Sequence, residues 1–232
     1  MELLVKRVSG NGLPMKSGHL ATETILAAAN NVNQKLRDAV NGDLGVNLDL
    51  YEIIDLRMLS GMIGEMFTSE VTTIEERVIK NPNIDGYPDL CDVSHKDQSE
   101  KIKQFSIDKF LDYEHGGFEV KNTFGVKKSK KHLAARESRI NAIQKRLVWK
   151  AHHRETNHLI ALQSDYVKKI PQIVACFYSD QLCKDDWTEK QQPKSGSTMT
   201  SFSQTTKSAY DKLKSGIIFC AKEGNYEDFI RN

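Results

Sequence analysis

Two short apolar runs lie close together in the second half of the chain, "HLIALQSDYV" at 158–167 and "PQIVACFYSD" at 171–180. Each is bounded by turn-forming residues, and each has the length of a buried β-strand. Neither approaches the roughly 18 apolar residues that would span a bilayer, and we find no such stretch elsewhere in the sequence. A chain with two runs of this kind is expected to build its core around a β-sheet.

Segments with helical periodicity lie on both sides of these runs. Apolar residues spaced i, i+3, i+4 predict helices over 17–40, 48–69 and 131–150. Further strands are expected near 88–93 and 117–123. The mixed order, without a clean boundary, predicts one α/β or α+β domain over the 232 residues, with a central mixed β-sheet flanked by helices.

The C-terminal part and the cysteines add weaker expectations. The polar run at 184–208 predicts a long loop, followed by a helix ending near Gly216 and a last strand in "GIIFCA". The four cysteines form no C-x-x-C pair, which disfavours structural zinc. Scattered cysteines without a signal peptide predict a reducing cytoplasm.

Charge is strongly segregated along the chain, although the formal net charge is only +2. Residues 1–119 carry a net charge of −8, whereas residues 120–154 carry +10 and residues 155–232 are balanced. A basic block of this density attracts phosphate backbones. A solvated helix face is the plainer alternative, but it seldom needs so much charge.

The stretch "GGFEVKNTFG" at 116–125 places an acid and a lysine two residues apart. Residues i and i+2 of a strand share a face, so Glu119 and Lys121 project together while Phe118 and Val120 face the core. Asp89 opens the preceding strand, so two antiparallel strands would bring both carboxylates together. Paired carboxylates suit a hard cation such as Mg²⁺, and a neighbouring lysine can orient or deprotonate water.

Pro88–Asp89 followed by Glu119-Val120-Lys121 resembles the PD-(D/E)XK nuclease superfamily, and within it a type II restriction endonuclease. The order of expected elements between about 50 and 180 also resembles that family. The resemblance implies a restriction-endonuclease-like catalytic core, preceded by a helical part at about 17–70 and followed by a C-terminal part at 184–232.

By this resemblance, Asp89 and Glu119 would hold Mg²⁺, for which Mn²⁺ can substitute, with the Val120 carbonyl as a further ligand. Lys121 would position the water that attacks a DNA phosphodiester, giving a 5′-phosphate and a 3′-hydroxyl. Glu65 is the candidate helical acid, and a partly exposed helix glutamate is an equal alternative. Asp92 is a rival ligand that strand alternation places on the opposite face.

Candidate DNA contacts fall in the basic block and in the polar C-terminal run. Lysines and arginines are suited to phosphates, while amides and hydroxyls can read base edges. The candidates are Asn122, Lys127, Lys128, Lys130, Lys131, Arg136, Arg139, Arg154, Ser203, Gln204, Thr205 and Lys207. Adjacent His152 and His153 point in different directions and do not predict a metal site.

The resulting expectation is a cytoplasmic Mg²⁺-dependent endonuclease that cuts double-stranded DNA at a short palindromic sequence. Palindromic sites match two-fold protein symmetry, which predicts a homodimer. Neither a membrane nor a nucleotide cofactor is expected. The alternatives are a structure-specific repair, recombination or phage nuclease, a non-catalytic DNA-binding module, and a protein whose helices pack against a partner.

Overall fold

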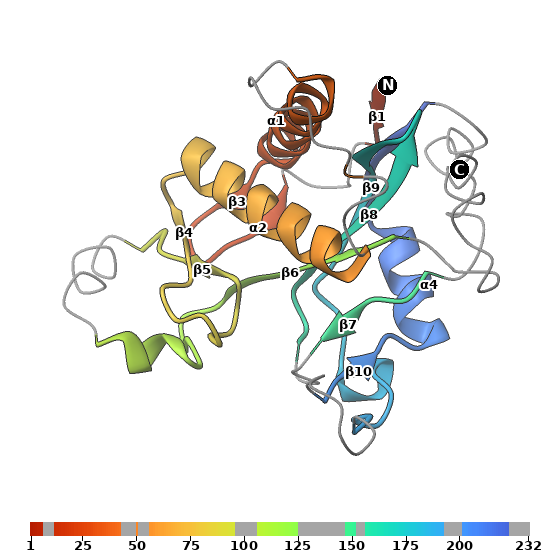
Figure 1. The fold of residues 1–232 in the computed structure, drawn as a ribbon. Helices are drawn as coiled ribbons and strands as arrows, with labels where there is room; N and C mark the ends of the chain where they lie inside the picture. The colour runs from red at the N-terminus through yellow and green to blue at the C-terminus, as the bar shows by residue number, and fades with distance from the viewer. Residues whose placement is uncertain are drawn as a thin grey trace.

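A seven-stranded mixed sheet forms the centre of the molecule (Figure 1). The computed structural model describes residues 1–6, 12–42, 50, 56–95, 106–124, 147–151, 156–192 and 201–222. Neighbouring strands are antiparallel except β6 and β8, which are parallel. The order across the sheet is β1 (Leu3–Val5), β11 (Ile217–Ala221), β9 (Ile170–Ser179), β8 (Leu159–Val167), β6 (Gly117–Thr123), β5 (Leu90–Asp92) and β4 (Val78–Lys80).

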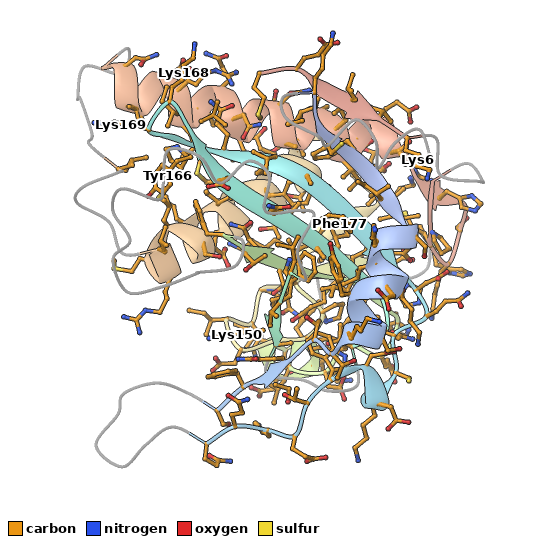
Figure 2. The ribbon with its side chains drawn as sticks, turned by 90° about the vertical axis from the view of Figure 1, so that its right-hand side faces the viewer. Lys6, Lys150, Tyr166, Lys168, Lys169 and Phe177 are labelled. Carbon is orange, nitrogen blue, oxygen red and sulfur yellow. The ribbon has the colours of Figure 1, made fainter. Side chains whose placement is uncertain are left out.

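Helices cover both faces of this sheet. Helices α1 (Thr22–Asn41) and α2 (Leu56–Ile74) pack against each other, and they contact β9 and β6 respectively. Helix α4 (Lys207–Ser215) lies on the other face against β9, where Figure 2 shows it in front of the strands with α1 behind them. Two small pairs, β2 (Leu13–Pro14) with β3 (His19–Leu20) and β7 (Lys150–Ala151) with β10 (Ser203–Gln204), complete the fold.

Strand β8 has buried apolar side chains on both faces of the sheet. Ile160 and Leu162 belong to the core beneath α1 and α2, while Leu159 and Ala161 belong to the core beneath α4. All four side chains are fully buried. Because successive side chains of a strand point to opposite faces, a continuous apolar run is what a strand with two covered faces requires.

Most expected elements are confirmed. The strands expected at 117–123, 158–167 and 171–180 correspond to β6, β8 and β9, and the α+β class with a mixed, helix-flanked sheet is correct. The helix expected from residue 17 begins at Thr22, because His19 and Leu20 pair with β2. The second helix extends beyond residue 69 to Ile74.

Two expectations are wrong in part. The helix expected over 131–150 does not reach its predicted end, since Lys150 and Ala151 form β7; residues 131–146 lie outside the described part of the chain. The expected loop at 184–208 contains a 3₁₀ turn, strand β10 and the start of α4. Within the described residues, no helix is long and apolar enough to cross a membrane.

Candidate active site

Asp89, Glu119 and Lys121 meet where β5 separates from β6. The two strands pair through Leu90 with Phe118 and Cys91 with Gly117. A side chain on Gly117 could not be accommodated, because its Cβ would lie 1.9 Å from the Leu90 carbonyl oxygen. Close pairing at this end of β6 therefore holds Asp89, which directly precedes β5, against the strand that carries Glu119 and Lys121.

The Lys121 ammonium lies between the two carboxylates. Its Nζ is 2.6 Å from Glu119 Oε1 and 2.9 Å from Asp89 Oδ2. The acids are also tied to the backbone: Val120 N–H donates to Asp89 Oδ2 at 2.8 Å, and Asp89 N–H donates to Glu119 Oε2 at 3.2 Å. The expected convergence of these three side chains is confirmed, and Phe118 and Val120 are buried in the core as expected.

Burial controls the electrostatics of this cluster. Glu119 is only 3% exposed, and burial together with the negative charge of Asp89 raises its pKa to about 7, although Lys121 opposes the increase. Burial alone would lower the pKa of Lys121, but Glu119 and Asp89 outweigh it and raise that pKa above its usual range. Lys121 therefore remains an ammonium at neutral pH and acts here as a hydrogen-bond donor.

A cavity of about 180 Å³ opens beside this cluster, at the edge of β6 that faces away from β8. Glu119 N–H donates to the His158 carbonyl just before β8, so the polar groups of Val120 point toward the opposite edge. On this edge Asp89 accepts from Val120 N–H, and Ser60 Oγ donates to the Asn122 carbonyl at 2.8 Å. The Val120 carbonyl therefore points toward the edge that bears the cavity.

Helix α2 forms the opposite wall of the cavity through Ser60, Gly61, Gly64 and Thr68. Sequence reasoning did not identify these residues. A Cβ added at Gly61 or Gly64 would meet no atom within 4 Å, so protein packing does not require glycine at either position. Glycine in a helix interior costs about 1 kcal/mol relative to alanine. Two glycines spaced i, i+3 within one helix are the sequence signal that could have indicated this open wall.

Glu65 also lines the cavity but does not join the cluster. Its side chain is 64% exposed and forms an ion pair with Lys80, the last residue of β4. Glu65 and Asp89 also line a second, adjoining cavity of about 450 Å³. Glu65 lies on helix α2, which faces Asp89 across the cavity, and this agrees with its expected placement. The role of Glu65 as a helical acid stays a prediction.

Asp92 lies on the other side of β5, as strand alternation predicts. Its carboxylate accepts from Lys16 N–H at 2.6 Å and from Ser94 N–H at 2.9 Å. Asp92 lines a separate cavity of about 340 Å³, together with His158. Both of its oxygens bind backbone N–H groups, and its position on the opposite side of β5 separates it from Asp89.

Two of the expected DNA contacts are corrected. Ser203 and Thr205 are fully buried, and Thr205 Oγ1 accepts from Trp149 N–H, so neither side chain faces a DNA groove. The Asn122 amide is used inside the protein: its Oδ1 accepts from Ser164 Oγ at 2.9 Å, and its Nδ2 donates to the Ser60 carbonyl at 3.3 Å. Asn122 thereby connects β6 to β8 and α2.

The remaining DNA contacts stay predictions. Gln204 is half-buried in β10, and Lys207 at the start of α4 is 81% exposed. The basic candidates Lys127, Lys128, Lys130, Lys131, Arg136, Arg139 and Arg154 lie outside the described residues, as do His152 and His153.

The structural role of Asn122 leads to a stability prediction. Asn122→Ala leaves Ser164 Oγ without its acceptor and removes the side-chain hydrogen bond from β6 to α2, which is expected to lower the free energy of unfolding by about 1–3 kcal/mol. Urea denaturation measures this change. Ser201→Ala, a substitution of a partly exposed residue outside this network, serves as the control. An unchanged urea midpoint for Asn122→Ala would contradict the assignment.

The donor set of the cluster can be compared with the needs of a metal ion. Among the described residues, no group of three or more His, Cys, Asp or Glu side chains is arranged to hold a metal. Two adjacent carboxylates and a nearby carbonyl are nevertheless a set that Mg²⁺ accepts, because it keeps several waters and takes few protein ligands. Asp89 and Glu119 are the carboxylates that could hold such an ion, and the Lys121 ammonium occupies the position between them in this structure.

Comparisons with protein-family models, curated proteins and solved structures found no match for this chain. Any assignment of function to the cluster therefore depends on its own residues and geometry.

Proposed function

We propose that this protein is a Mg²⁺-dependent endonuclease of the type II restriction class, with a restriction-endonuclease-like core that hydrolyses double-stranded DNA at a short palindromic sequence. The observation that supports this most strongly is the contact of Lys121 with both Asp89 and Glu119, at the edge of a cavity. Two carboxylates and an ammonium in one site are the groups needed for phosphodiester hydrolysis.

Each residue has a defined part in this proposal. Asp89 and Glu119 would hold Mg²⁺ with the Val120 carbonyl, and the ion would supply charge neutralisation at the phosphate. Lys121, held as an ammonium, donates hydrogen bonds that orient the attacking water and the phosphate oxygens. The hydrogen bonds from Val120 N–H to Asp89 and from Asp89 N–H to Glu119 keep the two carboxylates in position before substrate binds. Hydrolysis yields a 5′-phosphate and a 3′-hydroxyl.

Charge and symmetry support the choice of DNA as substrate. The block at 120–154, with a net charge of +10, begins within β6, so the acidic pair is followed directly in sequence by phosphate-attracting residues. A cut in both strands of a palindromic site requires two copies of one active site, which makes a homodimer the functional unit.

The test is incubation of the purified protein with phage-genome DNA and Mg²⁺, analysed on a gel. Discrete fragments that disappear with EDTA and with Glu119→Ala are the expected result. A smear would favour a nuclease that reads structure or no sequence at all. Intact DNA with a retained gel shift would contradict the enzyme and favour a DNA-binding module.

A further inference from the structure

The turn that joins β8 and β9 has backbone angles that its two residues rarely adopt. Val167 pairs with Ile170, so the loop consists of two residues, Lys168 and Lys169. Their φ angles are +52° and +65°, which makes the loop a type I′ turn. Asn-Gly is the usual sequence at these two positions, because side chains with ordinary Cβ atoms rarely adopt positive φ. Among the described residues, these two are the only non-glycine residues with positive φ.

Both lysine side chains are exposed at the outer end of the sheet (Figure 2). The stem below them is well held: Tyr166 is buried and its hydroxyl donates to the Leu50 carbonyl. Arg37 of α1 donates to the Gln172 side chain at 3.3 Å, which adds a third positive charge near the turn. The strained turn is therefore a fixed projection that presents adjacent positive charges, and backbone strain that persists at such a point is a sign of function.

The hairpin lies along the sheet from the candidate active site, beyond the C-terminal end of β6. Strand β8 is parallel to β6, with Ala161 beside Lys121. Beyond the short β5–β6 pairing, the cavity edge of β6 continues toward its C-terminal end. From Ala161 to Lys168 the chain advances seven residues, or about 23 Å at ~3.3 Å per residue. At ~3.4 Å per base pair, this corresponds to about seven base pairs of duplex.

We propose that the Lys168–Lys169 turn is a second contact for the DNA backbone, binding phosphates about seven base pairs from the scissile phosphate. This inference depends on the proposed function for its substrate. Lysine at positions 168 and 169 supplies the positive charge that binds phosphates, but Asn and Gly are the residues that favour this turn. DNA affinity and folding stability therefore favour different residues at these two positions.

Three double variants separate the effect of charge on DNA binding from the effect of turn preference on stability. Lys168→Asn with Lys169→Gly removes both charges and supplies the favoured turn residues. Lys168→Ala with Lys169→Ala removes the charges but keeps side chains that disfavour positive φ. Lys168→Arg with Lys169→Arg keeps the charges. Affinity for a 30-base-pair duplex is measured by fluorescence anisotropy in EDTA, over a range of NaCl concentrations, and thermal stability is measured on the same samples.

The Asn-Gly variant is expected to melt about 3 °C higher than the wild type. It is also expected to bind DNA about tenfold more weakly at 0.1 M salt, with the slope of log K against log[salt] smaller by about 1.8, the value for two lost phosphate contacts. The Ala-Ala variant should lose the same affinity without the gain in melting temperature. The Arg-Arg variant should keep the wild-type slope.

If the slope of log K against log[salt] is unchanged in the Asn-Gly variant, the proposed phosphate contact is wrong. If its melting temperature is unchanged, the inference that the Lys-Lys turn is strained is wrong. Cleavage in Mg²⁺, assayed separately, distinguishes this inference from the proposed function. A wild type that cleaves while the Asn-Gly variant keeps its slope contradicts only the contact. A wild type that binds through the turn but never cleaves contradicts only the nuclease.

Discussion

Lys121→Met is expected to lower the rate of DNA cleavage by a factor of about 10² to 10³, the range for loss of one hydrogen-bond donor positioned at the reacting groups. Methionine keeps most of the length of the side chain but removes the ammonium that contacts Glu119 Oε1 and Asp89 Oδ2. Single-turnover cleavage in Mg²⁺ measures the loss. The variant must still bind DNA, because the lysine acts on the reacting groups and not on the duplex as a whole.

The same substitution is expected to destabilise the metal-free protein by about 3–5 kcal/mol, because it leaves the buried Glu119 carboxylate beside partly exposed Asp89 without its cation. Glu119 is then expected to retain a proton to higher pH. Adding Mg²⁺ should raise the melting temperature of Lys121→Met more than that of the wild type, since the ion replaces the missing positive charge. An equal response of both proteins would contradict the shared carboxylate site.

Lys80→Met provides the matched control for stability. Lys80 also pairs with a carboxylate, that of Glu65, but both side chains are largely exposed. Exposed ion pairs contribute about 0–1 kcal/mol. A loss of stability as large as that of Lys121→Met would therefore contradict the importance assigned to burial.

Glu119→Gln is expected to abolish detectable cleavage and to change how stability depends on pH. The pKa of Glu119 is raised from 4.5 to about 7 in the folded protein, mainly by burial. A raised pKa means that the folded state binds the proton more tightly than the unfolded state, so this contribution to stability is present below pH 4.5 and is lost as pH rises through 7. Glutamine does not titrate, so the variant lacks this loss.

Thermal melts from pH 5 to pH 8 without divalent metal measure this effect. The melting temperature of Glu119→Gln, relative to that of the wild type, is expected to rise across the interval. Glu76→Gln, which changes an exposed glutamate just after the end of α2, should show no comparable trend. A difference in melting temperature between Glu119→Gln and wild type that stays constant from pH 5 to pH 8 would mean that Glu119 titrates outside this range.

Local sequence pattern was sufficient to locate the site because the site depends on strand alternation. Glu119 and Lys121 are two residues apart on one strand, and Asp89 directly precedes the adjacent antiparallel strand. Alternation placed Glu119 and Lys121 on one face and Asp92 on the opposite side of β5, and the assumed antiparallel pairing of the two strands brought Asp89 beside them.

Contacts between distant segments explain what sequence reasoning missed. The hydrogen bonds of the Asn122 amide were not foreseen, because its partners Ser60 and Ser164 are 62 and 42 residues away. The end of the expected 131–150 helix is replaced by β7, because Ala151 pairs with Ser203 and Trp149 N–H donates to Thr205. Strands of three residues, such as β1 and β4, are too short to show a period.

The most direct test of the central claim is the rate of Mg²⁺-dependent cleavage of duplex DNA by wild-type protein and by Glu119→Gln, assayed side by side with DNA binding and folding as controls. The account predicts discrete cleavage by the wild type, and none by a variant that remains folded and still binds DNA. Equal cleavage by both proteins, or a folded, DNA-binding wild type that leaves every tested duplex intact, would contradict it.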